Sequence, residues 1–168
     1  DTLAAVEALT EGPILPVGSS MGGWQSLLLV RALPARIAGL VTIAAAPDFT
    51  EDGYWASFTE AQKKTLAETG QVELPSDYME PYIITRRMIE DGRKQLVLRD
   101  PLHLPFPTRF LQGTADTAVS VATAVRLLEH AQGPDMQLQL VKDADHRFSD
   151  DRCLELLIQA VEEVSATA

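Results

Sequence analysis

The sequence predicts a single α/β domain built on a doubly wound, mostly parallel β-sheet, and three observations lead to this expectation. The chain has 168 residues, of which 46% are hydrophobic, and this suffices for one domain with its own core. Short apolar segments rich in β-branched residues alternate with longer segments of helical periodicity. Such alternation requires right-handed strand-helix-strand crossovers, which place helices on both faces of parallel strands.

Two helices and two strands are expected in the N-terminal part of the chain. A helix over residues 2–9 is followed by the apolar strand 14–17, which suits a buried parallel strand. Residues 21–33 return to helical spacing, until Pro34 stops the helix. Residues 39–44 are apolar on both faces, which is typical of a strand in the centre of a sheet.

The C-terminal part repeats this alternation. Strands are expected over 108–111 and 137–141, and alternating polar and apolar residues make the second of them an edge or half-covered strand. Between them, Ser120 can cap a helix that ends at Gly133. A last amphipathic helix begins near Asp150.

One segment interrupts the alternation. We expect a single domain over residues 1–168 that carries a lid-like insertion of polar helices over 48–106. Tyr54 and Trp55 are candidates for binding substrate, although aromatic residues in such a segment also serve to pack it. The aromatic residues considered for the insertion are Tyr54, Trp55, Phe58, Tyr78 and Tyr82.

Composition excludes several classes of function. With 14 basic and 24 acidic residues the formal net charge is -10, which repels nucleic acid and anionic lipid surfaces. The one cysteine, Cys153, cannot form an internal disulfide, and no apolar stretch approaches the roughly 20 residues of a membrane span. No targeting signal is visible, so a cytoplasmic location is expected.

A candidate nucleophile lies between the first expected strand and the helix that follows it. Residues 18–22 read Gly-Ser-Ser-Met-Gly and match G-x-S-x-G, the nucleophile elbow, in the strand-to-helix context that it requires. The positions two before and two after the nucleophile should be small, and Ser20 meets this condition with Gly18 and Gly22. Ser19 would place larger residues there. The alternative, a phosphate-binding turn, lacks both the dinucleotide and the P-loop patterns.

A serine nucleophile needs a base, and the base needs an orienting acid. The sequence has three histidines, and His146 follows the last expected strand, whereas His103 lies in a proline-bounded loop and His130 near a helix end. Asp116 follows the strand 108–111 and stands between serine and histidine in chain order. The alternative for Asp116 is an Asx-turn ahead of the next helix.

Three sequence segments around these candidate residues resemble a known group of proteins. The segment 18–24 (GSSMGGW), the pattern G-x-x-D-x-x-V over 113–119 and the segment 145–149 (DHRFS) resemble, in this order, the α/β-hydrolase superfamily. Residues 17–24 and 145–147 are most similar to its branch of palmitoyl-protein thioesterases and acyl-glucuronide esterases.

The resemblance implies a serine hydrolase that cleaves carboxylic esters or thioesters, with a small molecule or an acylated protein as substrate. It implies Ser20 as nucleophile, Asp116 as orienting acid and His146 as base, with the backbone N–H of Met21 as one oxyanion donor. No cofactor and no metal are implied. The alternative function is a non-catalytic or incomplete protein of this fold that binds a ligand or partner through the same cleft.

Members of this superfamily have several strands before the elbow strand, and these also supply the second oxyanion donor. Only 19 residues precede Ser20. We therefore expect that the N-terminal strands are missing from this chain, and that the elbow strand exposes an edge through which the chain forms oligomers.

Overall fold

The computed structural model describes residues 2–75 and 81–167. The chain forms two compact units. The first consists of Asp1–Pro47 together with Val97–Ala168, and the second of Asp48–Leu96. Residues 97–106, expected within the insertion, thus group with the first unit. The role of the insertion as a lid stays a prediction.

A four-stranded parallel sheet forms the centre of the first unit. Every neighbouring pair in it is parallel, and the spatial order is β1-β2-β6-β8. The predicted α/β class with a parallel sheet is therefore confirmed. The strands are β1 (Val17–Ser19), β2 (Leu40–Ile43), β6 (Thr108–Gly113) and β8 (Met136–Val141).

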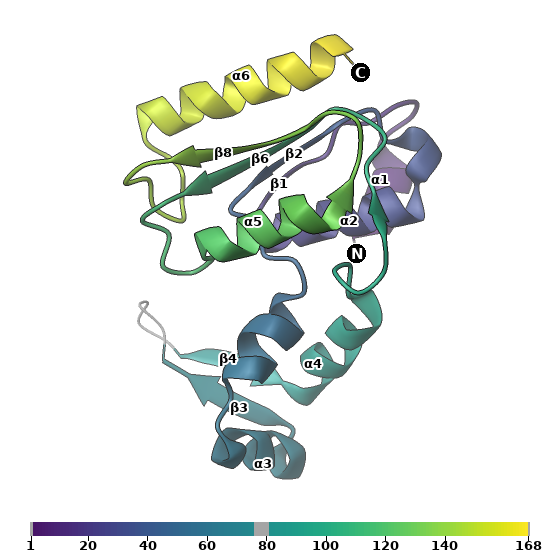
Figure 1. The fold of residues 1–168 in the computed structure, drawn as a ribbon. Coiled ribbons are helices and arrows are strands. Elements are labelled where there is room, and N and C mark those ends of the chain that lie inside the picture. Colours follow the sequence, from purple (N-terminus) through teal and green to yellow (C-terminus); the bar gives the residue numbers. More distant parts are fainter. Residues whose placement is uncertain (1, 76–80, 168) are drawn as a thin grey trace. The chain divides into compact units, whose positions relative to one another are not determined.

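Helices cover both faces of this sheet, as expected for a doubly wound fold. Figure 1 shows α6 on one face and both α2 and α5 on the other. The four helices of this unit agree closely with the predicted ones and are α1 (Thr2–Leu9), α2 (Met21–Ala32), α5 (Val121–His130) and α6 (Asp151–Thr167). Ser120 caps α5 as predicted, because its side chain accepts from the N–H of Thr123.

The first strand differs from its prediction. Strand 14–17 was expected, but regular pairing covers Val17–Ser19, and Ile14 forms only an isolated bridge with Ile37. Pro16 explains the shift, because it has no N–H to donate to the sheet. Three short elements were also not predicted: the 3₁₀ turn Pro34–Arg36, and the parallel pair of β5 (Leu102–His103) and β7 (Ala131–Gln132).

The two outer strands of the sheet differ in how they are covered. β8 lies at one end of the strand order, as predicted for an edge strand, but the predicted alternation breaks at Leu140, which is 47% exposed next to the exposed Gln139. β1 is the other outer strand among the described residues, and 48% of Val17 is exposed there. Association of chains through the β1 edge stays a prediction. On the α6 side, the sheet packs through a buried cluster that includes Val41, Leu111 and Phe148.

The second unit has its own small core. It contains a π-helical segment (Phe49–Trp55), α3 (Glu60–Thr69), the antiparallel pair β3 (Gln71–Leu74) and β4 (Tyr82–Thr85), α4 (Arg86–Gly92) and a 3₁₀ turn (Arg93–Gln95). The pair β3 and β4 was not predicted, since only polar helices were expected here. The core consists of Phe58, Leu66, Val72, Ile84 and Ile89.

Candidate active site

Ser20 occupies a strained turn between β1 and α2. Its backbone angles are φ 54° and ψ -118°, in a region that non-glycine residues rarely adopt. The backbone is held there by hydrogen bonds, because Ser20 N donates to Ile43 O at 2.8 Å and Ser20 O accepts from Gly23 N and Ala46 N. Serine before a helix usually caps it, but the Ser20 side chain makes no cap hydrogen bond. Its hydroxyl is therefore free to meet His146.

The two glycines around Ser20 have different roles. A Cβ on Gly18 would collide with the carbonyl group of Gly22 and lie 2.5 Å from Ser26 Oγ. A Cβ on Gly22 would meet nothing within 4 Å. The expectation that both positions must be small therefore holds at Gly18 and differs from the structure at Gly22. The backbone carbonyl of Gly22 leaves no room for a side chain at position 18, whereas position 22 itself has room for one.

His146 lies in the loop between β8 and α6, where the backbone is also unusual. Asp143 (φ 64°) and Phe148 (φ 52°) both adopt left-handed conformations. Asp145 Oδ1 accepts hydrogen bonds from Arg147 N at 3.0 Å and Phe148 N at 3.1 Å. The Phe148 ring is 2% exposed and belongs to the core next to α6. This loop is thus fixed on both sides of the histidine.

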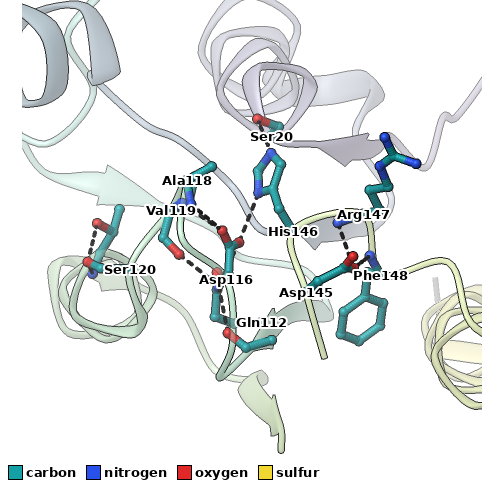
Figure 2. A network of polar contacts seen from close by, with 12 residues as sticks. Ser20, Gln112, Asp116, Ala118, Val119, Ser120, Asp145, His146, Arg147 and Phe148 are labelled. Atoms are coloured by element: carbon teal, nitrogen blue, oxygen red, sulfur yellow. Dashed lines mark hydrogen bonds and ion pairs between the residues drawn. The ribbon is translucent and has the colours of Figure 1, made fainter. Parts of the chain in front are cut away.

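The three predicted triad residues lie together in a continuous chain of hydrogen bonds (Figure 2). His146 Nε2 is 3.1 Å from Ser20 Oγ, and His146 Nδ1 is 2.9 Å from Asp116 Oδ2. The Asp116 side chain is 0% exposed and that of His146 is 32% exposed. A buried carboxylate at Nδ1 holds the proton on that nitrogen, so that Nε2 faces the serine hydroxyl as an acceptor.

Hydrogen bonds keep Asp116 ionised despite its burial. Burial raises the pKa of this carboxyl, but hydrogen bonds from Val119 N, His146, Gln112 and Ala118 N outweigh it and leave the pKa below its usual value. Oδ1 accepts from Ala118 N and Val119 N, each at 2.8 Å. The Asx-turn, which was the alternative for Asp116, is therefore present together with the contact to His146. Oδ1 of Asp116 binds the backbone of the turn, and Oδ2 binds the histidine.

The start of α2 offers a donor beside Ser20. Met21 is the first residue of this helix, and the first N–H groups of a helix have no acceptor in a preceding turn. The positive end of the helix dipole lies at the same place. The assignment of the Met21 N–H as an oxyanion donor stays a prediction.

The other candidate residues lie apart from this chain of contacts. His103 is on β5, and His130 Nε2 donates to the Asp100 carbonyl at 2.8 Å. Cys153 is buried in α6, and burial is the main cause that raises the pKa of its thiol to about 11, so it stays a neutral thiol. Among residues 2–75 and 81–167, no group of three His, Cys, Asp or Glu side chains is placed to hold a metal ion.

Tyr54 and Trp55 belong to the second unit and make contacts within it. The Tyr54 ring packs edge-on against Phe49 with a centroid distance of 5.6 Å. The Arg93 guanidinium lies 4.5 Å from the centroid of the Trp55 ring. These contacts favour the packing role for both aromatic residues, and their role in substrate binding stays a prediction. Tyr78 lies outside the described residues.

Two residues that support the site were not predicted for it. Gln112 ends the apolar part of β6 and donates to Asp116 Oδ2 at 3.0 Å. A polar residue directly after the apolar pair Phe110 and Leu111, and directly before Gly113, was the available signal. The structure places Asp145 as the acceptor that shapes the His146 loop, a role that the sequence analysis did not assign to it.

The Asp145 turn leads to a prediction about stability. Asp145→Ala leaves two N–H groups without their acceptor, so the free energy of unfolding is expected to fall by about 1–2 kcal/mol, as for the loss of a capping side chain. Asp145→Asn keeps an oxygen at the same place and is expected to lose less than half as much. Urea denaturation of both variants measures this difference. Equal losses in the two variants would show that the charge of Asp145 matters, and not its oxygen.

Comparison with solved structures identifies the class of fold. A protein described as a hydrolase from Agrobacterium vitis S4 superposes on 96% of the chain with a TM-score of 0.91 and 37% identity. The mouse alpha/beta hydrolase domain-containing protein 10 superposes on 99% of it with a TM-score of 0.88 and 27% identity. The chain spans 65% and 67% of these two proteins. The chain belongs to the α/β-hydrolase superfamily.

Within this superfamily, the chain is similar to enzymes named palmitoyl-protein thioesterase ABHD10. The mouse protein of that name is 31% identical over 166 residues, which are 98% of this chain and 56% of the relative. The human protein is 28% identical over the same share of the chain. The chain thus spans about half the length of the curated relatives it matches. No established family profile matches the chain.

The comparison corrects the expected location. The mammalian relatives are named as mitochondrial proteins, so the expectation of a cytoplasmic protein is wrong. That expectation rested only on the absence of a visible signal. In the described part of the chain, no helix has both the length and the apolar character needed to cross a membrane.

Proposed function

We propose that the chain carries the catalytic triad of a serine hydrolase that cleaves carboxylic esters or thioesters through an acyl-enzyme on Ser20. The observation that carries this proposal is the hydrogen-bonded chain from Ser20 Oγ through both nitrogens of His146 to Asp116. The order of these residues along the chain and the strained turn at Ser20 support the same conclusion.

In the first half of the reaction, Ser20 Oγ forms a bond to the carbonyl carbon of the substrate and its proton passes to His146 Nε2. The carbonyl oxygen becomes an oxyanion, for which the Met21 N–H is the proposed donor. When the bond to the leaving group breaks, His146 returns the proton to the departing oxygen or sulfur. Asp116 stays ionised and stabilises the imidazolium that forms between these steps.

In the second half, water takes the place of the leaving group. His146 accepts a proton from water as the water oxygen bonds to the acyl carbon. The bond between that carbon and Ser20 Oγ then breaks, and His146 gives the proton to Oγ. The acid is released and the free serine returns.

The substrate class is an acyl ester or thioester, carried by a small molecule or by an acylated protein. The thioester alternative is supported by the relatives, which are named palmitoyl-protein thioesterases.

Acylation of Ser20 can be tested with p-nitrophenyl acetate. Release of nitrophenolate and the intact mass of the protein are followed together for the unchanged chain, Ser20→Ala and Ser19→Ala. We expect Ser20→Ala to lose both the acetyl adduct and the release of nitrophenolate above background, and the neighbouring Ser19→Ala to keep them. Equal release by the unchanged chain and by Ser20→Ala would refute the proposal and favour a non-catalytic protein of this fold.

A further inference from the structure

Gln112 is fully buried at the C-terminal end of β6, and its side chain lies next to that of Asp116 (Figure 2). Its amide nitrogen lies 3.0 Å from Asp116 Oδ2, 3.0 Å from the Val119 carbonyl oxygen and 3.1 Å from the Gly113 carbonyl oxygen. In the described part of the chain, its amide oxygen has no hydrogen-bond partner although it is buried. The amide nitrogen therefore has three acceptors within hydrogen-bond distance, whereas the amide oxygen has no donor.

These contacts determine which way the amide faces. If the amide were turned over, its oxygen would meet three other acceptors, one of them an ionised carboxylate, and no hydrogen bond would form. The NH2 group must therefore point at Asp116. The same NH2 binds the carbonyl of Val119, whose own N–H binds Asp116 Oδ1, so the three residues form a closed cluster.

Each oxygen of Asp116 accepts two hydrogen bonds in this cluster. Oδ1 is bound by two backbone N–H groups, and Oδ2 is shared between Gln112 Nε2 and His146 Nδ1. Without Gln112, Oδ2 would keep only the histidine, and the backbone contacts to Oδ1 would leave the carboxylate freer to rotate. Because both donors act on one oxygen, Gln112 sets the direction from which His146 is bound.

We propose that Gln112 is a positioning residue of the catalytic site, which holds Asp116 ionised and aligned on His146. This inference rests on the proposed function. The amide nitrogen also contacts the Val119 and Gly113 carbonyls, which helps to hold the turn that carries Asp116. Its contact with Asp116 Oδ2 joins the same amide to the triad, and this contact is what the positioning role requires.

Two substitutions of similar shape separate a donor role from a packing role. Gln112→Met removes the donor and is expected to slow acylation of Ser20 about tenfold to a hundredfold, with KM little changed, since a hydrogen bond to a charged group is lost. Gln112→Glu is expected to restore much of the rate near neutral pH. In this buried place, beside Asp116, the new carboxyl stays protonated and donates its O–H.

The pH profile distinguishes these variants further. The acylation rate of the unchanged chain over the same pH range is the reference. For Gln112→Glu the rate should fall below this reference at higher pH, because ionisation of the new carboxyl removes the donor and places a second negative charge beside Asp116. Asp116 and His146 are the ionisable side chains bound within this cluster. Gln139→Met, a change at an exposed glutamine on β8, should behave as the unchanged chain.

The proposal is wrong if folded Gln112→Met acylates as fast as the unchanged chain, or if Gln112→Glu follows the unchanged chain at every pH. Thermal unfolding of each variant shows whether it is folded, and Gln112→Glu decides the matter if Gln112→Met does not fold. If the unchanged chain itself is not acylated, the proposed function has failed. The NMR signal of the His146 Nδ1 proton then decides about Gln112: it should shift in Gln112→Met and stay in place in Gln139→Met.

Discussion

Asp116→Asn is expected to slow acylation of Ser20 by about 10⁴-fold while the chain stays folded. The two N–H groups at Oδ1 hold the asparagine oxygen in that place, so its NH2 group occupies the position of Oδ2. This NH2 faces the NH2 of Gln112 and the Nδ1 of His146. Nδ1 must then accept, and the ring proton moves to Nε2, where it blocks removal of the proton from Ser20.

The rate of acylation by p-nitrophenyl acetate measures this effect. Asp135→Asn is a matched control. Asp135 lies just before β8 and forms a partly exposed ion pair with Arg109 on β6, with 2.9 Å between the charged atoms. We expect this control to acylate at the unchanged rate. A loss of less than tenfold in Asp116→Asn would show that the carboxylate does not orient the base.

The lowered pKa of Asp116 adds a pH dependence to the same variant. An acid whose pKa is lower in the folded than in the unfolded chain stabilises the fold above its unfolded pKa, about 3.9 for aspartate. This stabilisation is lost as the pH falls through the lower folded value. The unchanged chain should therefore lose more stability than Asp116→Asn when the pH is lowered through this range.

Gly18→Ala is expected to disrupt the turn at Ser20, whereas Gly22→Ala is expected to be tolerated. The methyl group at position 18 would lie 2.5 Å from the carbonyl carbon of Gly22, and backbone atoms cannot yield as a flexible side chain does. We expect the free energy of unfolding to fall by about 1–3 kcal/mol, together with most of the acylation rate. At position 22 the added Cβ meets open space, and alanine favours the helix by about 0.5–1 kcal/mol.

Urea denaturation and the acylation rate of the two variants test this contrast. The pair is informative because both glycines belong to the same G-x-S-x-G pattern and differ only in what surrounds them. Equal destabilisation by both substitutions would contradict the account of the turn in which the backbone of Gly22 is the obstacle.

Much of the fold follows from local sequence patterns, because several helices and strands of the first unit bury apolar residues at the spacing of their element. The helix over Thr2–Leu9 and the strands around Val41 and Phe110 have the expected places. The pair β3 and β4 escaped prediction because its strands have four residues each and fold into a small separate core. β1 was shifted because Pro16 has no N–H to donate, although its carbonyl accepts from Val41 N.

The three residues of the proposed triad could be brought together from the sequence because each of them follows a strand, and these strands end at one edge of a parallel sheet. The supporting residues could not be found in this way. Gln112 acts through an amide whose orientation depends on carbonyl groups of other residues. Asp145 shapes a loop by accepting from two backbone N–H groups. Such roles depend on backbone geometry that sequence spacing does not reveal.

The central claim, that His146 and Asp116 activate Ser20, is tested most directly with a fluorophosphonate probe, which reacts with an activated serine whatever the natural substrate is. The chain is incubated with the probe and its intact mass is read, beside Ser20→Ala and Ser19→Ala. We predict one adduct on the unchanged chain and on Ser19→Ala, and none on Ser20→Ala. An adduct that persists in Ser20→Ala, or none on the unchanged folded chain, would contradict the account.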